Sequence, residues 1–266
     1  MTWLRGRVRS WRGGVRSHAG GRGSVVTVVC GVLVSLVAVV TAGAQPTANA
    51  AASDDVSGLP LHVVAASGAP AALAVLLSGD GGWVSIDKRI AAYLAAHGIG
   101  VAGVDSRAYL MRKRTPDEVA ADVARIIRHY EALWAVDRVA LVGYSRGADI
   151  APFAANRLPA DLRQQIGLVA LLGPADRAGF QFHWIDLLKN DPRPSDPPVL
   201  PELERLRGTP VLCVYGAEEE ESLCRLADTS AVHMDRHPGH HHFDGDYDAI
   251  AAEIVRLFAP LDAGRR

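Results

Sequence analysis

The chain has 266 residues, 49% of them hydrophobic, and is therefore long enough to bury one sizeable core. Its formal net charge is -1, and loss of the first 44 residues, which hold six arginines and no acid, would leave 22 basic against 29 acidic residues, a net charge of -7. A domain of that sign is excluded as a generic nucleic-acid binder.

The N-terminal segment has the pattern of an export signal. Six arginines lie in the first 23 residues, an almost wholly apolar stretch runs from Val25 to Ala44, and small-residue cleavage sites end at Ala44 or Ala50. We expect residues 1–44 to be a signal peptide; the alternative is an uncleaved membrane anchor formed by residues 24–44. Residues 45–58 are rich in Ala, Ser, Thr and Asp and predict a disordered spacer.

From Leu59 onward, short apolar runs alternate with segments of helical periodicity. The expected strands are 72–77, 99–104, 139–142, 166–172, 209–215 and 231–234, and the expected helices are 86–97, 115–134, 148–155, 201–206 and 247–258. This alternation predicts one α/β domain, residues 59–262, with a mostly parallel central sheet and helices on both faces. The long connection 180–200 would form a lid, a substrate wall or an ordinary surface excursion.

Gly143-Tyr144-Ser145-Arg146-Gly147 is a G-x-S-x-G motif between an expected strand and an expected helix. In that context the serine stands on a sharp turn with its hydroxyl exposed, and the two glycines let the strand and the helix approach closely. We therefore expect Ser145 to be a nucleophile. The rival interpretation is a chance match in a glycine-rich chain.

A serine nucleophile needs a base and an acid that orients the base. The base is expected after the last strand, in His240-His241-His242, with His241 first, then His242, then His240. The acid is expected after the preceding strand, with Glu219 first, Glu218 second and Asp176 as a spare. A rival metal site would use His237, His240, His242, Asp244 and Asp246, but their spacing matches no tight ligand template, and we expect no metal or cofactor.

Two further sets of residues follow strands and would serve the site. The Arg146 backbone N–H and the Ser78–Trp83 turn, with Asp80 and Gly81, would form an oxyanion hole; a phosphate loop is disfavoured because no Lys-Ser/Thr ends the turn. Substrate contacts are expected from Trp83, Arg107, Tyr109 and Asp149. The basic side chains (Arg107, Arg112, Lys113, Arg114 and Arg146) would meet an anionic group or form a solvated face, and Asp149 would meet an ammonium or serve only the helix start.

Three cysteines are present, and Cys30 falls inside the expected signal peptide. In an exported domain the remaining pair, Cys213 and Cys224, would form one disulfide that closes a short loop. The alternative is two reduced cysteines, with Cys213 buried in a strand.

Four segments together resemble the bacterial virulence protein VirJ and the related C-terminal half of AcvB. They are Leu77–Trp83, Gly143–Asp149, Tyr215-Gly216 and His241–Tyr247. The resemblance implies a periplasmic α/β-hydrolase that cleaves aminoacylated phosphatidylglycerol, chiefly lysyl-phosphatidylglycerol, with a link to type IV secretion and without a cofactor. Arg146 stands where family members carry an aromatic residue, a departure that bears on headgroup preference.

Two other functions fit the same pattern. One is a non-catalytic binding module that uses the hydrolase scaffold to dock to secretion components. The other is an esterase that acts on a soluble ester or lactone rather than on an aminoacylated phospholipid at the membrane surface.

Overall fold

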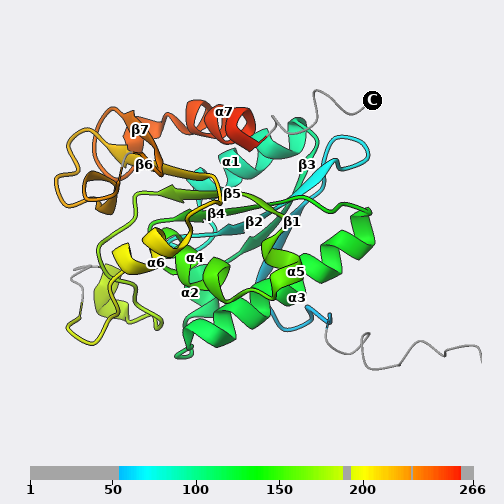
Figure 1. Cartoon of the computed structure of the whole chain (residues 1–266), viewed down its shortest axis with the longest axis horizontal. Helices are drawn as coiled ribbons and strands as arrows, with labels where there is room; N and C mark the ends of the chain where they lie inside the picture. The colour runs from blue at the N-terminus through cyan, green and yellow to red at the C-terminus, as the bar shows by residue number, and fades with distance from the viewer. Residues whose placement is uncertain (1–53, 188–192, 229, 259–266) are drawn as a thin grey trace, which may run out of the picture. The chain divides into compact units, whose positions relative to one another are not determined.

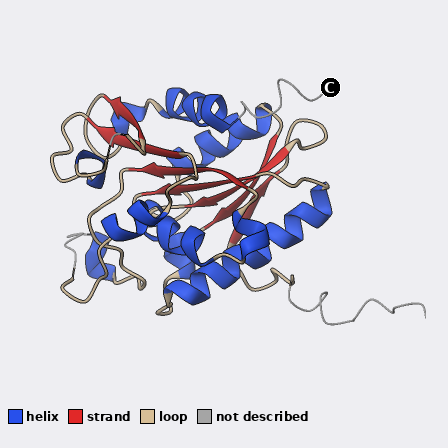
Figure 2. Cartoon of the chain, viewed as in Figure 1, coloured by secondary structure: helices blue, strands red, loops and turns tan. Residues whose placement is uncertain are grey.

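The computed structural model describes residues 54–187, 193–228 and 230–258, and in them a central sheet lies between helices on both faces (Figures 1 and 2). The strands are β1 (Leu61–Val64), β2 (Ala72–Leu77), β3 (Ile99–Val104), β4 (Val139–Tyr144), β5 (Ile166–Leu172), β6 (Val211–Gly216) and β7 (His233–His237). The helices are α1 (Ser85–Ala96), α2 (Ser106–Tyr109), α3 (Pro116–Trp134), α4 (Arg146–Arg157), α5 (Ala160–Arg163), α6 (Leu200–Arg205) and α7 (Tyr247–Phe258). Single 3₁₀ turns are η1 (Trp184–Leu187), η2 (Leu223–Arg225) and η3 (Phe243–Gly245).

The sheet has the strand order β1-β3-β2-β4-β5-β6-β7, and only β1 runs antiparallel to its neighbour. The chain passes from β2 to β3 on one side and then to β4 on the other, so the strand order reverses between β2 and β4. Leu77 pairs with Gly143, which brings the carboxyl ends of these two strands level. A crevice at such a reversal is where open α/β sheets bind ligands.

The strands read as continuous apolar runs because both faces of the sheet are covered. Every residue of β4 is buried, with Val139 and Leu141 packed on the face that α3 and α4 cover. Ala140 and Val142 pack on the opposite face, with α1 and α7. The predicted α/β architecture is therefore confirmed.

Helix α3 begins as predicted. The Thr115 hydroxyl accepts a hydrogen bond from the Glu118 N–H (3.2 Å), and the Glu118 carboxylate accepts one from the Thr115 N–H (2.7 Å), with Pro116 at the first helical position. Two edge strands differ from expectation. β1 was not predicted. β7 begins at His233, two residues later than expected, because the sequence of β7 is polar and its side chains are only partly covered.

The N-terminal predictions fall mostly outside the described residues, including the signal or anchor segment. Residues 54–58, the end of the expected spacer, pack against α3: the Asp54 carbonyl oxygen lies 3.2 Å from His129 Nδ1, and Arg125 donates to the Asp55 carbonyl. The expected disorder therefore does not extend to these five residues. Among the helices that the structure describes, none combines the length and the hydropathy needed to cross a bilayer.

Candidate active site

Ser145 occupies a strained turn between β4 and α4. Its φ of 52° is in the left-handed region, which non-glycine residues rarely adopt. The backbone on both sides is held, because the Ser145 N–H donates to the Leu172 carbonyl (2.8 Å) and its own carbonyl accepts from the Asp149 N–H (3.0 Å). This is the geometry that the G-x-S-x-G motif predicts.

The two glycines of the motif are required by close backbone contacts. A Cβ on Gly147 would lie 2.0 Å from the Leu77 carbonyl oxygen, and one on Gly143 would lie 2.4 Å from the Gly147 carbonyl oxygen. The end of β2 therefore abuts the first turn of α4. That contact sets Ser145 beside the loop that follows β2, since a Cβ on Gly79 would lie 3.1 Å from Ser145 Cβ.

His241 and Glu219 are joined by a hydrogen bond of 2.7 Å between Nδ1 and Oε1. The other carboxylate oxygen of Glu219 accepts from the Gly216 N–H (3.1 Å), which fixes the side chain. Burial alone raises the pKa of Glu219, but the bond and charge of His241, with smaller help from Gly216 and Arg225, bring the pKa below its usual value. An ionised carboxylate only accepts, so His241 Nδ1 carries the proton and Nε2 is left as an acceptor.

The alternative acids and bases have other partners. His242 Nδ1 lies 2.9 Å from the Tyr144 hydroxyl, and the exposed His240 pairs with the exposed Glu218 (2.8 Å). Asp176 lies in the wall of the same cavity as His241 but is not its hydrogen-bond partner. The geometry therefore favours His241 and Glu219 over their rivals.

A cavity of about 700 Å³ contains both Ser145 and His241 in its wall. The rest of the wall consists of Asp149, Gly173, Pro174, Ala175, Asp176, Glu219, Glu220, Glu221, Ser222, Arg225 and Leu226. Five of these side chains are acidic and one is basic. Ser145 and His241 border the same cavity without a hydrogen bond between the Ser145 hydroxyl and the imidazole, and bonds of this kind tighten when a substrate binds.

The loop after β2 is tied to the first residue of α4. The buried Arg146 guanidinium donates to both carboxylate oxygens of Asp80, with Nε–Oδ1 at 3.0 Å and Nη2–Oδ2 at 2.8 Å. The Arg146 N–H is at the first position of α4, directly after Ser145. The ion pair therefore holds together two segments whose amides are expected to form the oxyanion hole. Gly81, in the first of these segments, is not crowded, because a Cβ there would contact only the Val84 side chain.

Asp149 is a buried carboxyl one turn beyond Ser145, and it borders the cavity. Its Oδ1 accepts from the Ala175 N–H at 2.7 Å. Burial raises the pKa of Asp149 to about 7, although the nearby charge of Arg146 opposes this. A carboxyl so poorly solvated would gain from a cationic partner in the cavity.

Three residues expected to contact substrate are placed elsewhere. Trp83 stacks on His62 (ring centroids 5.1 Å apart) and covers Gly103. The buried Tyr109 donates its hydroxyl to Asp122 (2.7 Å), and Arg107 lies beside Gly82. None of them is in the wall of the cavity that Ser145 and His241 border. All three residues follow strands as expected, but Trp83 turns toward the sheet and Tyr109 toward α3.

Two residues that support the site were not predicted. Gly173 has a φ of 62°, and a Cβ there would lie 2.8 Å from His241 Nδ1. Arg225 donates to the carbonyls of Glu219 and Ala217 (both 2.9 Å). The position of Gly173 directly after the strand 166–172 was a signal that the sequence offered. Nothing in the sequence pattern indicated a role for Arg225.

The rival metal interpretation gains no support from the described residues, in which no group of three or more His, Cys, Asp or Glu side chains is placed to hold an ion. His237 instead lies between two carboxylates, with Nε2 2.9 Å from Asp235 and Nδ1 3.1 Å from Asp246. This network fixes the loop that carries the histidine triplet.

The predicted disulfide is confirmed: Cys213 in β6 is bonded to Cys224 in η2, with their Cα atoms 5.6 Å apart. The bond closes a loop that contains Glu219, Glu220 and Glu221. It therefore restrains the segment that forms one wall of the cavity that Ser145 and His241 border.

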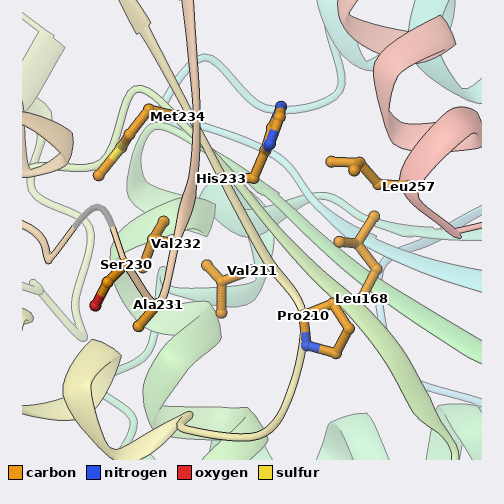
Figure 3. Close-up of a pocket in the computed structure, with 9 residues that line it drawn as sticks. All are labelled: Leu168, Pro210, Val211, Ser230, Ala231, Val232, His233, Met234 and Leu257. Carbon is orange, nitrogen blue, oxygen red and sulfur yellow. The ribbon is translucent and has the colours of Figure 1, made fainter.

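A second hollow, of about 500 Å³, lies at the opposite, amino-terminal ends of β6 and β7 (Figure 3). Its only hydroxyl side chain, Ser230, bonds to Asp228 (2.8 Å), and its histidine, His233, pairs with Glu253 (2.8 Å). Neither arrangement joins a nucleophile to a base, so this hollow is not the better site.

Comparison with known proteins supports the same fold. The family model of the bacterial virulence protein VirJ matches residues 71–260. A search of curated proteins finds no match. Among solved structures, Est1E from Butyrivibrio proteoclasticus is similar at a TM-score of 0.55 and 15% identity, over 77% of this chain and 97% of that one.

Two other solved structures give the same result. MenH from S. aureus has a TM-score of 0.54 at 14% identity, over 74% of this chain and 97% of that one. An alpha-beta serine hydrolase homologue from Coxiella burnetii has a TM-score of 0.51 at 15% identity, over 75% of this chain and 91% of that one. At these identities the likeness establishes the α/β-hydrolase fold.

Proposed function

This chain belongs to the VirJ family of bacterial virulence proteins, and we propose that it is a serine esterase that cleaves the aminoacyl ester of an aminoacylated phospholipid. The observation that carries the proposal is the hydrogen-bonded pair His241–Glu219, which shares one cavity with Ser145 on its strained turn. A fixed imidazole with a free Nε2 is what a serine hydroxyl needs to become a nucleophile.

The reaction follows from these positions. Ser145 Oγ attacks the ester carbonyl while His241 Nε2 takes the hydroxyl proton, and the Glu219 carboxylate stabilises the resulting imidazolium. The amide donors expected from Arg146 and the loop at Asp80 meet the oxyanion. The C–O bond to the lipid glycerol then breaks, and His241 returns the proton to the leaving oxygen. Water, activated by the same histidine, hydrolyses the acyl-enzyme and releases the amino acid.

The charge of the cavity supports an aminoacyl substrate, and lysyl-phosphatidylglycerol above all. Acidic side chains dominate the wall, and Asp149 is a buried carboxyl one helical turn from the nucleophile. An α-ammonium or a lysyl side chain entering this space would be attracted, whereas a carboxylate would be repelled. The fatty-acid esters of the same lipid carry no such charge.

An oxidising compartment fits the disulfide, because such bonds persist outside the cytosol. We propose that the domain works in the periplasm, either after export by residues 1–44 or anchored through residues 24–44. Association with type IV secretion components is part of the same proposal and rests on the family alone.

The test is lipid analysis of vesicles that contain lysyl-phosphatidylglycerol, incubated with wild-type protein or with Ser145→Ala. Wild-type protein should release lysine and leave phosphatidylglycerol, and Ser145→Ala should leave the lipid intact. Cleavage of a soluble ester with no loss of the lipid would replace the proposal with a soluble-ester esterase. No cleavage of either by folded wild-type protein would favour a binding module.

A further inference from the structure

Exposed apolar side chains gather at the edge of the sheet that carries the catalytic cavity. Among the described residues the large exposed ones are Val63, Val84, Met111, Leu133, Trp184, Ile185 and Leu226. Five of the seven follow the carboxyl end of a parallel strand, the exceptions being Val63 in β1 and Leu133 in α3. Single exposed apolar residues are normal on a protein surface, but their concentration at one edge of the sheet indicates an interaction surface.

Three of them form one patch on two joined loops. Met111 follows α2 and is 51% exposed, whereas Trp184 and Ile185 begin η1 and are 67% and 54% exposed. The two loops are paired by backbone bonds, from the Phe182 N–H to the Leu110 carbonyl (2.8 Å) and from the Arg114 N–H to the Phe180 carbonyl (2.9 Å). The patch is therefore one surface rather than two unrelated loops.

The base of this patch consists of buried aromatic side chains. Phe180 is buried and packs edge-on against Phe153 of α4, with ring centroids 5.2 Å apart. Phe182 is also buried, and its ring packs edge-on against Trp184 at 5.4 Å. The apolar tips project from an anchored support, so their exposure is built into the fold.

Two exposed cations lie next to Met111 in the patch. Arg112 and Lys113 directly follow Met111, both are exposed, and neither forms an ion pair with any described residue. Arg114, the next residue, is half-buried over the Tyr109 ring and bonded to Asp122. In a domain whose overall charge is negative, two exposed cations, Arg112 and Lys113, beside exposed apolar groups are complementary to an anionic surface.

The patch is close to the catalytic cavity. The segment that carries Trp184 begins at Gly173–Asp176, which forms part of the cavity wall. It then passes Arg146 so closely that a Cβ on Gly179 would lie 1.9 Å from Nη1. Trp184 is five residues beyond Gly179, a span of at most about 18 Å. In Figure 1 this yellow-green segment lies at the end of the sheet toward which the strand arrowheads point.

We propose that Met111, Trp184 and Ile185, with Arg112 and Lys113, form a docking surface for an anionic phospholipid bilayer. The apolar tips and the tryptophan would enter the interface, and the cations would face the lipid phosphates. The inference rests on the proposed function, because a lipid substrate must be presented to the cavity. Docking at this edge holds the cavity mouth near the headgroup that carries the ester.

Flotation with vesicles tests the docking surface, with Ser145→Ala protein as the parent so that no substrate is consumed. Binding to phosphatidylglycerol-rich vesicles should exceed binding to phosphatidylcholine vesicles and should weaken with salt. Trp184→Ser with Ile185→Ser should reduce binding at least tenfold, and Arg112→Gln with Lys113→Gln should reduce it by about fivefold per cation removed. Leu133→Ser, an exposed leucine on α3, is the matched control and should bind as the parent does.

Thermal melting shows which variants are folded, and Trp184→Phe provides a second measurement that does not depend on a disruptive change. Quenching of tryptophan fluorescence by lipids with brominated chains should be strong in the parent and mostly lost in Trp184→Phe. Unchanged binding in both double variants, or equal loss in Leu133→Ser, would overturn the proposal. If the protein binds vesicles through the patch but wild-type protein cleaves no lipid, docking stands and only the esterase proposal is contradicted. If wild-type protein cleaves the lipid but binding does not depend on the patch, the esterase proposal stands and docking is contradicted.

Discussion

His241 Nδ1 lies 2.7 Å from Glu219 Oε1, and this bond joins the loops that follow two neighbouring strands, β6 and β7. The second oxygen of Glu219 is held by the Gly216 N–H, so the carboxylate has one orientation. The imidazole is therefore oriented by the backbone of the sheet edge itself. Its second nitrogen is free for the cavity that Ser145 also borders.

Glu219→Gln should lower kcat by about 10³-fold with little change in KM, because the neutral amide no longer fixes the proton on Nδ1 or stabilises the imidazolium. Steady-state kinetics on a soluble ester measures this. Glu218→Gln is the matched control, since Glu218 is exposed and pairs with His240. Equal losses in the two variants would contradict the assignment of Glu219.

Asp149→Asn should raise KM for an aminoacyl ester by about 10- to 100-fold, the scale of a lost charged hydrogen bond, and should leave KM for a neutral acyl ester nearly unchanged. The asparagine keeps an oxygen for the Ala175 N–H and loses only the charge. Asp161→Asn, an exposed acid on α5, should change neither value. Parallel losses on the two esters would show that Asp149 is needed for the fold of the site and not for an ammonium.

Loss of the disulfide should lower both stability and activity. Cys213→Ala with Cys224→Ala should reduce the free energy of unfolding by about 2–4 kcal/mol, because a loop closure is released in the unfolded chain. It should also lower kcat, since the freed loop carries Glu219. Denaturant melts with and without reductant measure the first effect. The double variant should not respond to reductant, and a wild-type protein equally indifferent to it would contradict the prediction.

Asp87 should make the protein less stable as the pH rises from about 4 to about 7. The carboxyl is buried, its Oδ1 has no partner among the described residues, and burial raises its pKa to about 7 from 3.8. The folded state thus keeps a proton that the unfolded state releases across this window, so stability is lost with rising pH.

Asp87→Asn keeps an acceptor for the Val84 N–H and removes the titration. Chemical unfolding at about pH 4.5 and about pH 7.5 should show a smaller difference for the variant than for wild type, by on the order of 1–2 kcal/mol. An unchanged difference would contradict the inferred burial cost.

The sequence predicted the elbow at Ser145 and the two loops that carry His241 and Glu219, because parallel strands bring the loops after their carboxyl ends to one edge of the sheet. It ranked His241 first among three adjacent histidines, but only on spacing along the chain. That choice depends on a tight turn in which Gly239, Phe243, Asp244 and Gly245 all have positive φ. Two of these are not glycines, so spacing alone gave no sign of the conformation.

The expected substrate contacts show what the sequence could not predict, which is the direction in which a side chain turns. Trp83 and Tyr109 follow strands, yet one side chain packs on His62 and Gly103 and the other bonds to Asp122. Position along the chain predicts which loop a residue joins, whereas packing decides which way its side chain turns. β7 was misplaced for a related reason, since an edge strand with polar residues lacks the apolar run that marks the buried strands.

The most direct test of the catalytic account is fluorophosphonate labelling followed by mass-spectrometric mapping of the modified peptide. The account predicts a single covalent adduct on Ser145, abolished in Ser145→Ala and strongly slowed in folded His241→Ala protein. Labelling that survives Ser145→Ala, or that proceeds at the wild-type rate without His241, would contradict it.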